Sequence, residues 1–316
     1  MRQPRALAHP LQGRSFTLAE ALAAGETPKR LRGRDVLTPS RGIRVPWGVS
    51  QDFRNAVAPL LALTPGAVAC WGSAARIWNL PLPGRLSSEP AVHLATAGVA
   101  AIRRFGVVGH RLRLTDAEMT VYQGIPLTTV SRTWLDLAAQ LSLEDAVILG
   151  DAIVSDHRRP FAPPSDPLGT LGQLRDTVQS HAGARGLKVA RTALELVRTG
   201  SASPPETRLR LAAERVGLPE PEHGIILYDE AGTERAWPDL GWRRYRVGIQ
   251  YDGAHHLSQE QQERDARRDN FSAASGWISL KVNRDMVRKH GYDGVMRQIG
   301  QVLRSRGWRP GHPAEW

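Results

Sequence analysis

Residues 237–256 carry carboxylate and amide side chains whose spacing suits phosphate chemistry. The segment reads as two strands joined by a tight turn centred on Arg244 and Tyr245. That turn places Asp239 directly opposite Gln250, and cross-strand partners of this kind lie roughly 5 Å apart at Cβ. Two oxygen-bearing side chains are therefore expected to meet across a hairpin.

The alternation of apolar and polar residues after the turn decides which side chains share a face. The apolar residues of 246–252 point one way, whereas Gln250 and Asp252 point the other way. Asp239 joins the polar face from the preceding strand. Oxygen ligands of this kind suit hard divalent cations, so we expect Asp239, Gln250 and Asp252 to hold Mg²⁺ or Mn²⁺ in a phosphodiesterase.

Three further residues complete the expected catalytic set. Glu206 lies in the first turn of a helix expected over 204–213, from which it could reach the metal through a bridging water. His256 follows the strand end and suits phosphate contact or proton transfer. Lys281, on a strand expected over 278–282, would neutralise charge at the scissile phosphate.

A strongly charged helix is expected over 259–271. Arg264, Arg267 and Arg268 fall at i, i+3 and i+4, which forms one basic stripe able to follow a DNA backbone. The alternative is a surface helix whose charges pair with one another, since Asp265 and Asp269 alternate with these arginines. Likewise, the dipeptide at 252–253 is also an ordinary turn signal after a strand.

The composition favours a multidomain globular protein with a polyanionic partner. The chain has 316 residues, 42 Lys and Arg against 31 Asp and Glu, and a formal net charge of +11. The chain has a single cysteine, Cys70, which excludes an internal disulfide or a cysteine-based zinc site. This residue lies in an apolar run. No apolar stretch approaches the ~20 residues that cross a bilayer, and the N-terminus lacks a signal-peptide pattern, so we expect a cytoplasmic protein.

Basic residues are concentrated in the first 46 positions. A short helix is expected from Leu18 to Gly25, a second over 27–34, and a hairpin around 38–41. This order, with charge on the second helix, is that of a winged helix that reads duplex DNA; the alternative is a basic helical cap on the next domain. The expected DNA contacts are Lys29, Arg30, Arg32, Arg34, Arg41 and Arg44.

A mixed α/β region is expected over 52–155. Its conspicuous polar residues are spread over several elements, so helix capping and ion pairing are their expected roles; they are Ser73, His93, His110, Arg132 and Asp136. A proline-rich connector with two helices, at 169–180 and 186–198, follows. Helices at 204–213 and 293–304 bracket the last domain.

Short motifs support two resemblances. The C-terminal ~115 residues resemble the PD-(D/E)XK endonuclease superfamily near its Vsr-like branch; the motifs are Ser203 to Arg208, Pro238-Asp239, Val247 to Gly253 with His256, Arg264-Asp265 with Arg268, and Gly276-Trp277 before Lys281. The first ~155 residues are similar to AbiEi-family antitoxins; here the motifs are Phe16 to Pro46, Gly72 to Ala75, Gly109 to Arg111, and Gly124 to Thr128 with Arg132, Thr133 and Asp136. The whole arrangement resembles that of actinobacterial proteins.

The resemblances imply an α/β (α+β) multidomain protein. We expect a winged helix at 1–48, an AbiEi-like middle domain at 49–155, a connector at 156–200, and a restriction-endonuclease-like domain at 201–316. They imply a Mg²⁺-dependent endonuclease acting on DNA, in defence or toxin–antitoxin biology. The alternative is a non-enzymatic antitoxin-like regulator with a cognate toxin or self-association. Gln250 favours that alternative, because the superfamily usually carries Asp or Glu there and a neutral amide weakens cation binding.

Overall fold

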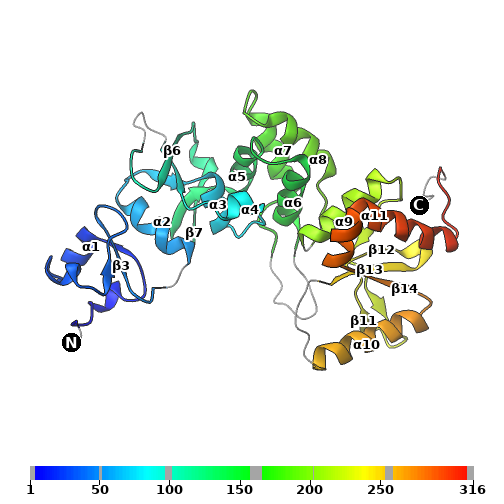
Figure 1. Cartoon of the computed structure of the whole chain (residues 1–316). Helices are drawn as coiled ribbons and strands as arrows, with labels where there is room; N and C mark the ends of the chain where they lie inside the picture. The colour runs from blue at the N-terminus through cyan, green and yellow to red at the C-terminus, as the bar shows by residue number, and fades with distance from the viewer. Residues whose placement is uncertain are drawn as a thin grey trace. The chain divides into compact units, whose positions relative to one another are not determined.

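The computed structural model describes residues 4–49, 52–96, 102–156, 166–201, 203–252 and 259–311 (Figure 1). Over these residues the chain is a mixed α/β protein with eleven α-helices and several sheets. It divides into two compact units, which we call unit 1 (1–145 and 172–191) and unit 2 (146–171 and 192–316). None of the described helices is both long and apolar enough to cross a membrane.

Unit 1 begins with a small three-stranded sheet in the order β1-β3-β2, formed by β1 (Phe16–Thr17), β2 (Val36–Leu37) and β3 (Ile43–Pro46). Helix α1 (Leu18–Ala23) follows β1, and Thr17 and Glu20 form a capping box at its N-terminus. Strands β2 and β3 pair antiparallel with Leu37 opposite Val45. The expected first helix and hairpin are therefore present.

The prediction of a second N-terminal helix, over 27–34, is wrong. The structure has only the 3-10 turn η2 (Arg30–Arg32), with Gly33 already extended. Pro28 and Gly33 leave too few residues between them to propagate a helix after its costly first turn. The Thr27 hydroxyl accepts from the Arg30 backbone N–H at 3.2 Å and so caps this single turn.

A five-stranded mixed sheet in the order β6-β5-β4-β8-β7 forms the centre of unit 1. Its strands are β4 (Ala67–Ala69), β5 (Val92–Thr96), β6 (Val107–Arg111), β7 (Met119–Tyr122) and β8 (Ile125–Thr128). The accompanying helical elements are α2 (Phe53–Ala62), α3 (Trp71–Ile77), α4 (Gly84–Ser87), the 3-10 turn η3 (Asp116–Glu118), α5 (Val130–Leu137) and α7 (Leu171–Ser180). Ser73 does not cap α3 as expected, since its hydroxyl accepts from the His93 N–H and ties α3 to β5.

Unit 2 is built on a four-stranded sheet in the order β14-β13-β12-β9. Its strands are β9 (Glu222–His223), β12 (Leu240–Trp242), β13 (Val247–Asp252) and β14 (Ile278–Asn283), and a separate hairpin joins β10 (Leu227–Tyr228) to β11 (Glu234–Ala236). Its complete helices are α9 (Pro204–Arg215), α10 (Gln259–Ala274) and α11 (Arg284–Ser305). Two more helices, α6 (Leu143–Val154) and α8 (Leu187–Leu196), have residues in both units, as does α7 through Leu171.

Helices cover both faces of the sheet in unit 2 (Figure 1). On one face Leu209 of α9 and Ile299 of α11 share a core with Ile249 of β13 and Val282 of β14. Helix α10 lies on the other face, where Phe271 packs against the β10–β11 hairpin. Strands β13 and β14 therefore present their apolar side chains to α9 and α11 and their polar side chains to α10.

Helix α11 is longer than expected. A first turn begins at Arg284, where Asn283 caps it by accepting from the Met286 N–H at 2.9 Å. Gly291 then breaks the helix with φ of 65°. The section beyond this break is the helix that the sequence indicates from Asp293 onwards.

A buried ion pair fixes α9 to α6 within unit 2. The side chains of Arg210 and Asp151 are 2% and 1% exposed, and their charged atoms lie 2.8 Å apart. The Thr207 hydroxyl and the Arg198 backbone N–H also donate to the Asp151 carboxylate. These contacts hold the first turns of α9, where Glu206 lies.

Candidate functional site

The hairpin that carries Asp239 has the register expected from the sequence. Leu240 pairs with Ile249 and Trp242 with Val247, as expected, but Asp239 lies just before these pairs and bonds to Ile249 instead of pairing with Gln250. The Asp239 N–H donates to the Ile249 carbonyl at 2.9 Å, and the Tyr251 N–H donates to the Asp239 carboxylate at 2.8 Å. This carboxylate is therefore fixed against the neighbouring strand.

Strand β14 adds Lys281 to the same row of residues. It runs parallel to β13 and pairs Lys281 with Gln250 and Asn283 with Asp252. Since paired residues of neighbouring strands share a face, Lys281 and Gln250 both point towards α10. We call Asp239, Gln250 and Lys281 the Asp239 row: Gln250 and Lys281 are paired on adjacent strands, and the Asp239 carboxylate is bonded to Tyr251, next to Gln250.

Helix α10 supplies charged partners to this row. The amide oxygen of Gln250, a buried residue, accepts from Arg268 Nη2 at 2.7 Å. Arg268 also lies 3.0 Å from an oxygen of Asp265, and Lys281 Nζ lies 2.6 Å from an oxygen of Asp269. The charges of this helix are therefore partly paired with one another and partly with the sheet.

The other expected catalytic residues are not part of the group formed by Asp239, Gln250 and Lys281. Glu206 is buried in the first turn of α9, on the other side of the sheet from α10, and its carboxylate accepts from the Ser203 hydroxyl at 2.8 Å. Ser203 does not cap α9 through its side chain. Asp252 is exposed at the end of β13. His256 lies outside the described residues.

The oxygen atoms of Asp239 and Gln250 would suit a magnesium ion that takes its other ligands from water and substrate. Within the described ranges, no group of three or more His, Cys, Asp and Glu side chains is arranged to hold a metal. Mg²⁺, however, commonly binds through one or two carboxylates, several waters and a substrate phosphate. The Asp239 carboxylate and the Gln250 amide oxygen suit this mode of binding, because each has further lone pairs beyond its hydrogen bond to the protein.

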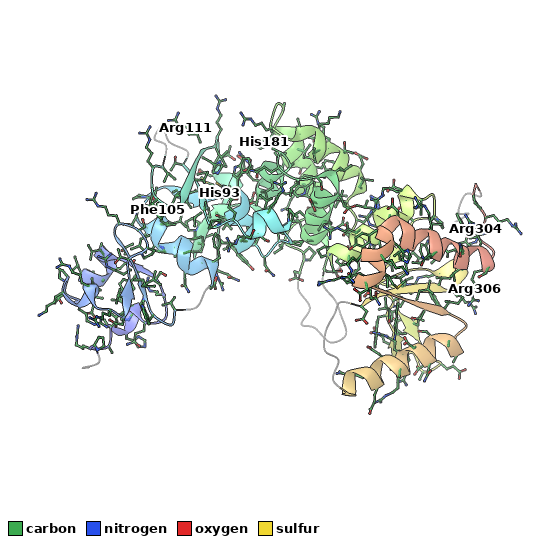
Figure 2. The ribbon with its side chains drawn as sticks, in the orientation of Figure 1. His93, Phe105, Arg111, His181, Arg304 and Arg306 are labelled. Carbon is green, nitrogen blue, oxygen red and sulfur yellow. The ribbon has the colours of Figure 1, made fainter. Side chains whose placement is uncertain are left out.

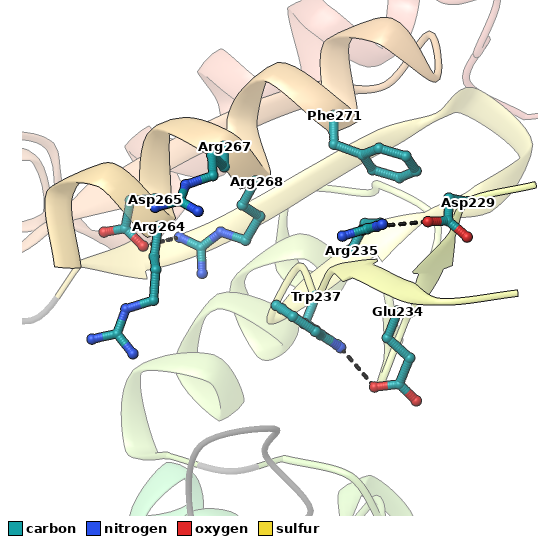
Figure 3. A pocket seen from close by; sticks show the side chains of 9 residues that line it. All are labelled: Asp229, Glu234, Arg235, Trp237, Arg264, Asp265, Arg267, Arg268 and Phe271. Carbon is teal, nitrogen blue, oxygen red and sulfur yellow. Dashed lines mark hydrogen bonds and ion pairs between the residues drawn. The ribbon is translucent and has the colours of Figure 1, made fainter. Parts of the chain in front are cut away.

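A pocket of about 500 Å³ lies between α10 and the β10–β11 hairpin (Figure 3). Its lining residues are Asp229, Glu234, Arg235, Trp237, Arg264, Asp265, Arg267, Arg268 and Phe271. Arg268 belongs both to this pocket and to the Gln250 contact, so the pocket adjoins the Asp239 row. The three arginines expected to contact DNA all line it.

Sequence reasoning missed Arg235, Trp237 and Phe271 as members of this pocket. The signal for the first two was present, because buried Ala236 separates them and strand side chains alternate. Phe271 had no such signal. Its ring joins the pocket only because α10 packs against the hairpin.

The basic residues near the N-terminus fall into two groups. Arg30 binds both carboxylate oxygens of Asp35, at 2.9 and 2.6 Å, and the Arg44 guanidinium donates to its neighbour's carbonyl. The other expected DNA contacts are exposed; they are Lys29, Arg32, Arg34 and Arg41. The Arg41 carbonyl accepts a hydrogen bond from the Arg104 guanidinium at 2.7 Å, and the residue after Arg104, Phe105, is 85% exposed (Figure 2).

The polar residues of the middle region form buried contacts. Arg132 lies 2.7 Å from Glu118 and 2.9 Å from Asp136, and His181 lies 2.8 Å from the same Glu118 oxygen. The Arg132–Asp136 ion pair expected from the sequence is therefore confirmed. Cys70 is fully buried, and burial raises the pKa of its thiol well above the usual value, which does not suit a nucleophile.

Two histidines of this region stack on one another. Nδ1 of His93 lies 2.8 Å from Nε2 of His110, and the His110 ring also stacks on Trp71. Burial, with the neighbouring His93, lowers the pKa of His110 to about 4. A neutral imidazole in a ring stack has a packing role, whereas the sequence predicted capping or ion pairing for this residue.

Two relatives are similar to most of this chain. They are the uncharacterised proteins MT2308 and Rv2248 of Mycobacterium tuberculosis, from strains CDC 1551 and H37Rv, each 25% identical over 257 residues. The matched region covers 78% of this chain and 87% of each relative. No protein-family model and no solved structure matches the chain. Its function must therefore be argued from its own residues.

Proposed function

We propose that the protein is a cytoplasmic DNA-binding protein and that its C-terminal part is a PD-(D/E)XK-type, Vsr-like domain hydrolysing phosphodiester bonds with Mg²⁺ or Mn²⁺. One observation carries the proposal: the Asp239 carboxylate accepts from the Tyr251 N–H, next to Gln250, and Lys281 is paired with Gln250 on the neighbouring strand. A carboxylate, an amide oxygen and a lysine in one part of the sheet, beside an arginine-lined pocket, are groups that phosphodiester cleavage uses.

Each residue has a separate part in the proposed reaction. Asp239 and Gln250 hold the divalent ion, which when bound polarises the phosphoryl group and lowers the pKa of a water molecule. Asp252 adds a second carboxylate, and Glu206 orders water from the opposite layer. When substrate binds, the Lys281 ammonium leaves Asp269 and contacts the substrate phosphate. It then stabilises the negative charge that develops on this phosphate. His256 carries the proton.

DNA contact in this proposal comes from both ends of the chain. The first 48 residues act as a reduced winged helix, with Lys29, Arg32, Arg34 and Arg41 on the phosphate backbone. Their exposure supports this role, whereas the internal contacts of Arg30 and Arg44 assign those two residues to the fold. In the C-terminal part, the arginines of α10 follow the strand that is to be cut.

A second candidate is a non-enzymatic regulator of the antitoxin kind, which binds its promoter and a cognate toxin or a second copy of itself. The observation that favours it is the Arg268 guanidinium on the Gln250 oxygen. A fixed cation beside a neutral ligand opposes the binding of a divalent ion. In this reading the C-terminal part binds nucleic acid without cleaving it.

Nicking of supercoiled plasmid by the purified full chain distinguishes the two candidates. The tested variants are Asp239→Ala and Asp252→Ala, with Asp293→Ala as the matched control because it removes an exposed carboxylate elsewhere in unit 2. Hydrolysis requires nicking that depends on Mg²⁺ or Mn²⁺, persists in the control and is lost in Asp239→Ala. DNA binding that survives EDTA without any nicking supports the regulator.

A further inference from the structure

We propose that the pocket between α10 and the β10–β11 hairpin holds one unpaired nucleotide of a DNA strand. The base lies against Trp237 and Phe271, and the phosphate lies on Arg264 and Arg267. The inference deepens the proposed function and rests on it for DNA as the partner. It adds the kind of DNA recognised, namely a strand with an extrahelical or single-stranded base.

The pocket has the size and the aromatic surface that a nucleotide needs. Its volume of about 500 Å³ lies within the ordinary range of small-molecule sites. Trp237 Nε1 donates to Glu234 at 3.2 Å, which fixes the indole, and Phe271 packs against Ile225 and Leu227. Two positioned rings offer faces on which any base can stack.

The arginines of the pocket differ in how firmly they are held. Arg235 lies 2.7 Å from Asp229, and Arg268 contacts Gln250 and Asp265, so these two belong to the framework. Arg267 is 77% exposed and makes a pair of 3.4 Å with Glu263, a spacing typical of weak surface pairs. Such a guanidinium can turn to a phosphate at little cost.

Arg264 is also exposed, and its side chain extends away from α10 (Figure 3). Together with Arg267 it lies on the solvent side of the helix, where a strand would arrive. The phosphate of a nucleotide entering the pocket therefore meets these two arginines first.

The acidic residues of the pocket argue against a bare polyphosphate as the ligand. Asp229, Glu234 and Asp265 lie among the four arginines and would repel a compact anion that enters fully. Carboxylates do accept hydrogen bonds from the amino groups of bases. Mixed charges with two aromatic rings therefore match a base joined to one phosphate.

An unpaired nucleotide fits better than a paired one because stacking requires a free face. Within a duplex both faces of each base are covered by neighbours, and a base reaches a protein pocket only by leaving the stack. Arg268 lines the pocket and also donates to Gln250. A nucleotide held here would place the adjoining phosphate near the Asp239 row.

The experiment measures equilibrium binding of two labelled duplexes by fluorescence anisotropy, with the full chain in EDTA. One duplex is fully paired, and the other carries a single unpaired nucleotide. We expect the wild-type protein to bind the second about tenfold more tightly. Trp237→Ala should abolish this preference while leaving the affinity for the paired duplex within about twofold, and Trp237→Phe should keep most of it.

Tyr228→Ala is the matched control, because Tyr228 is a 54% exposed aromatic residue of the same hairpin that does not line the pocket. Arg264→Ala, compared with Arg288→Ala on exposed α11, tests the phosphate contact without disturbing the core. Arg264→Ala should weaken binding of the unpaired-nucleotide duplex about fivefold more than Arg288→Ala does.

Equal wild-type affinity for the two duplexes, or a preference that persists in Trp237→Ala, overturns the pocket assignment. A preference that depends on Trp237 supports the pocket assignment even if the protein does not nick plasmid DNA. The absence of nicking contradicts only the proposed hydrolysis. Nicking without any preference contradicts the pocket alone. The two proposals therefore fail separately.

Discussion

Arg268 Nη2 donates a hydrogen bond of 2.7 Å to the amide oxygen of Gln250 and so joins α10 to the strand that carries the candidate metal ligands. Because Gln250 is buried, the bond lies where water competes poorly. The same guanidinium lies 3.0 Å from Asp265. The charge around Gln250 is therefore set by the helix as much as by the sheet.

Gln250→Glu should strengthen divalent-cation binding. The change places a second carboxylate next to Tyr251, the residue that bonds to Asp239, and Arg268 offsets part of the added repulsion. We expect the Mn²⁺ concentration for half-saturation to fall about tenfold. Titration calorimetry with Mn²⁺ measures this, with Gln301→Glu on the exposed surface of α11 as the control. An affinity that does not change in Gln250→Glu contradicts the assignment of Gln250 as a ligand.

Asp151→Ala should destabilise unit 2 strongly. The substitution removes the close counter-charge of the buried Arg210 guanidinium and leaves only the exposed Glu220 at 4.0 Å, at a cost of about 3–5 kcal/mol in the free energy of unfolding. Asp293→Ala removes an ion pair of similar length, to Arg215, from the exposed surface and should cost less than about 1 kcal/mol. Urea denaturation compares the two variants, and similar losses would show that the buried pair contributes nothing special.

The stability of unit 2 should fall as the pH is lowered from about 6.5 to about 4. Burial, and then the nearby charge of Arg210, lower the pKa of His223 to about 4 in the folded protein. In this window the unfolded chain binds a proton that the folded chain excludes. The stability present above pH 6.5 is therefore lost through the window, by on the order of 3 kcal/mol.

The variant His223→Gln cannot take up that proton. Urea unfolding of the wild type and this variant, followed across the same pH range, isolates the contribution of the imidazole. We expect a flatter dependence on pH in the variant. An identical dependence would mean that His223 titrates alike in both states.

Gly186→Ala should disrupt the packing between the loop that precedes α8 and the end of α5. Gly186 has φ of 79°, and a Cβ there would lie 2.3 Å from the Ala139 nitrogen. Backbone strain and this clash together should cost several kcal/mol. Gly183→Ala is a close control, because Gly183 has φ of 86° but nothing within 4 Å of an added Cβ. It should lose only about 1 kcal/mol in thermal or urea denaturation, and equal losses would contradict the clash.

The hairpin register could be predicted from the sequence because two local signals agree. The turn near Arg244 fixes which residues lie opposite each other, and the alternation of 247–252 fixes the faces. The structure accordingly pairs Leu240 with Ile249 and Trp242 with Val247, although Asp239, just before these pairs, bonds to Ile249 and is not paired with Gln250. Both signals act within a few residues, so no long-range contact was needed.

Two other features depended on contacts that local pattern does not encode. The helix expected over 27–34 is replaced by one turn, whose Arg30 side chain is bound by Asp35 and by the Arg5 carbonyl. The contact between Arg268 and Gln250 arises only when α10 packs on the sheet. Tertiary contacts decide both outcomes. For this reason the sequence predicted DNA contacts for Arg30 and Arg268, although both side chains form contacts within the fold.

The most direct test of the proposed hydrolysis is the single-turnover nicking rate of the wild type and of Asp239→Asn in Mn²⁺. This variant keeps the size of the side chain and an oxygen to accept from the Tyr251 N–H, but removes the charge that holds the ion. The account predicts nicking by the wild type and a rate at least a hundredfold lower in the variant, on the order of one lost transition-state contact. Equal rates in the two proteins would contradict it.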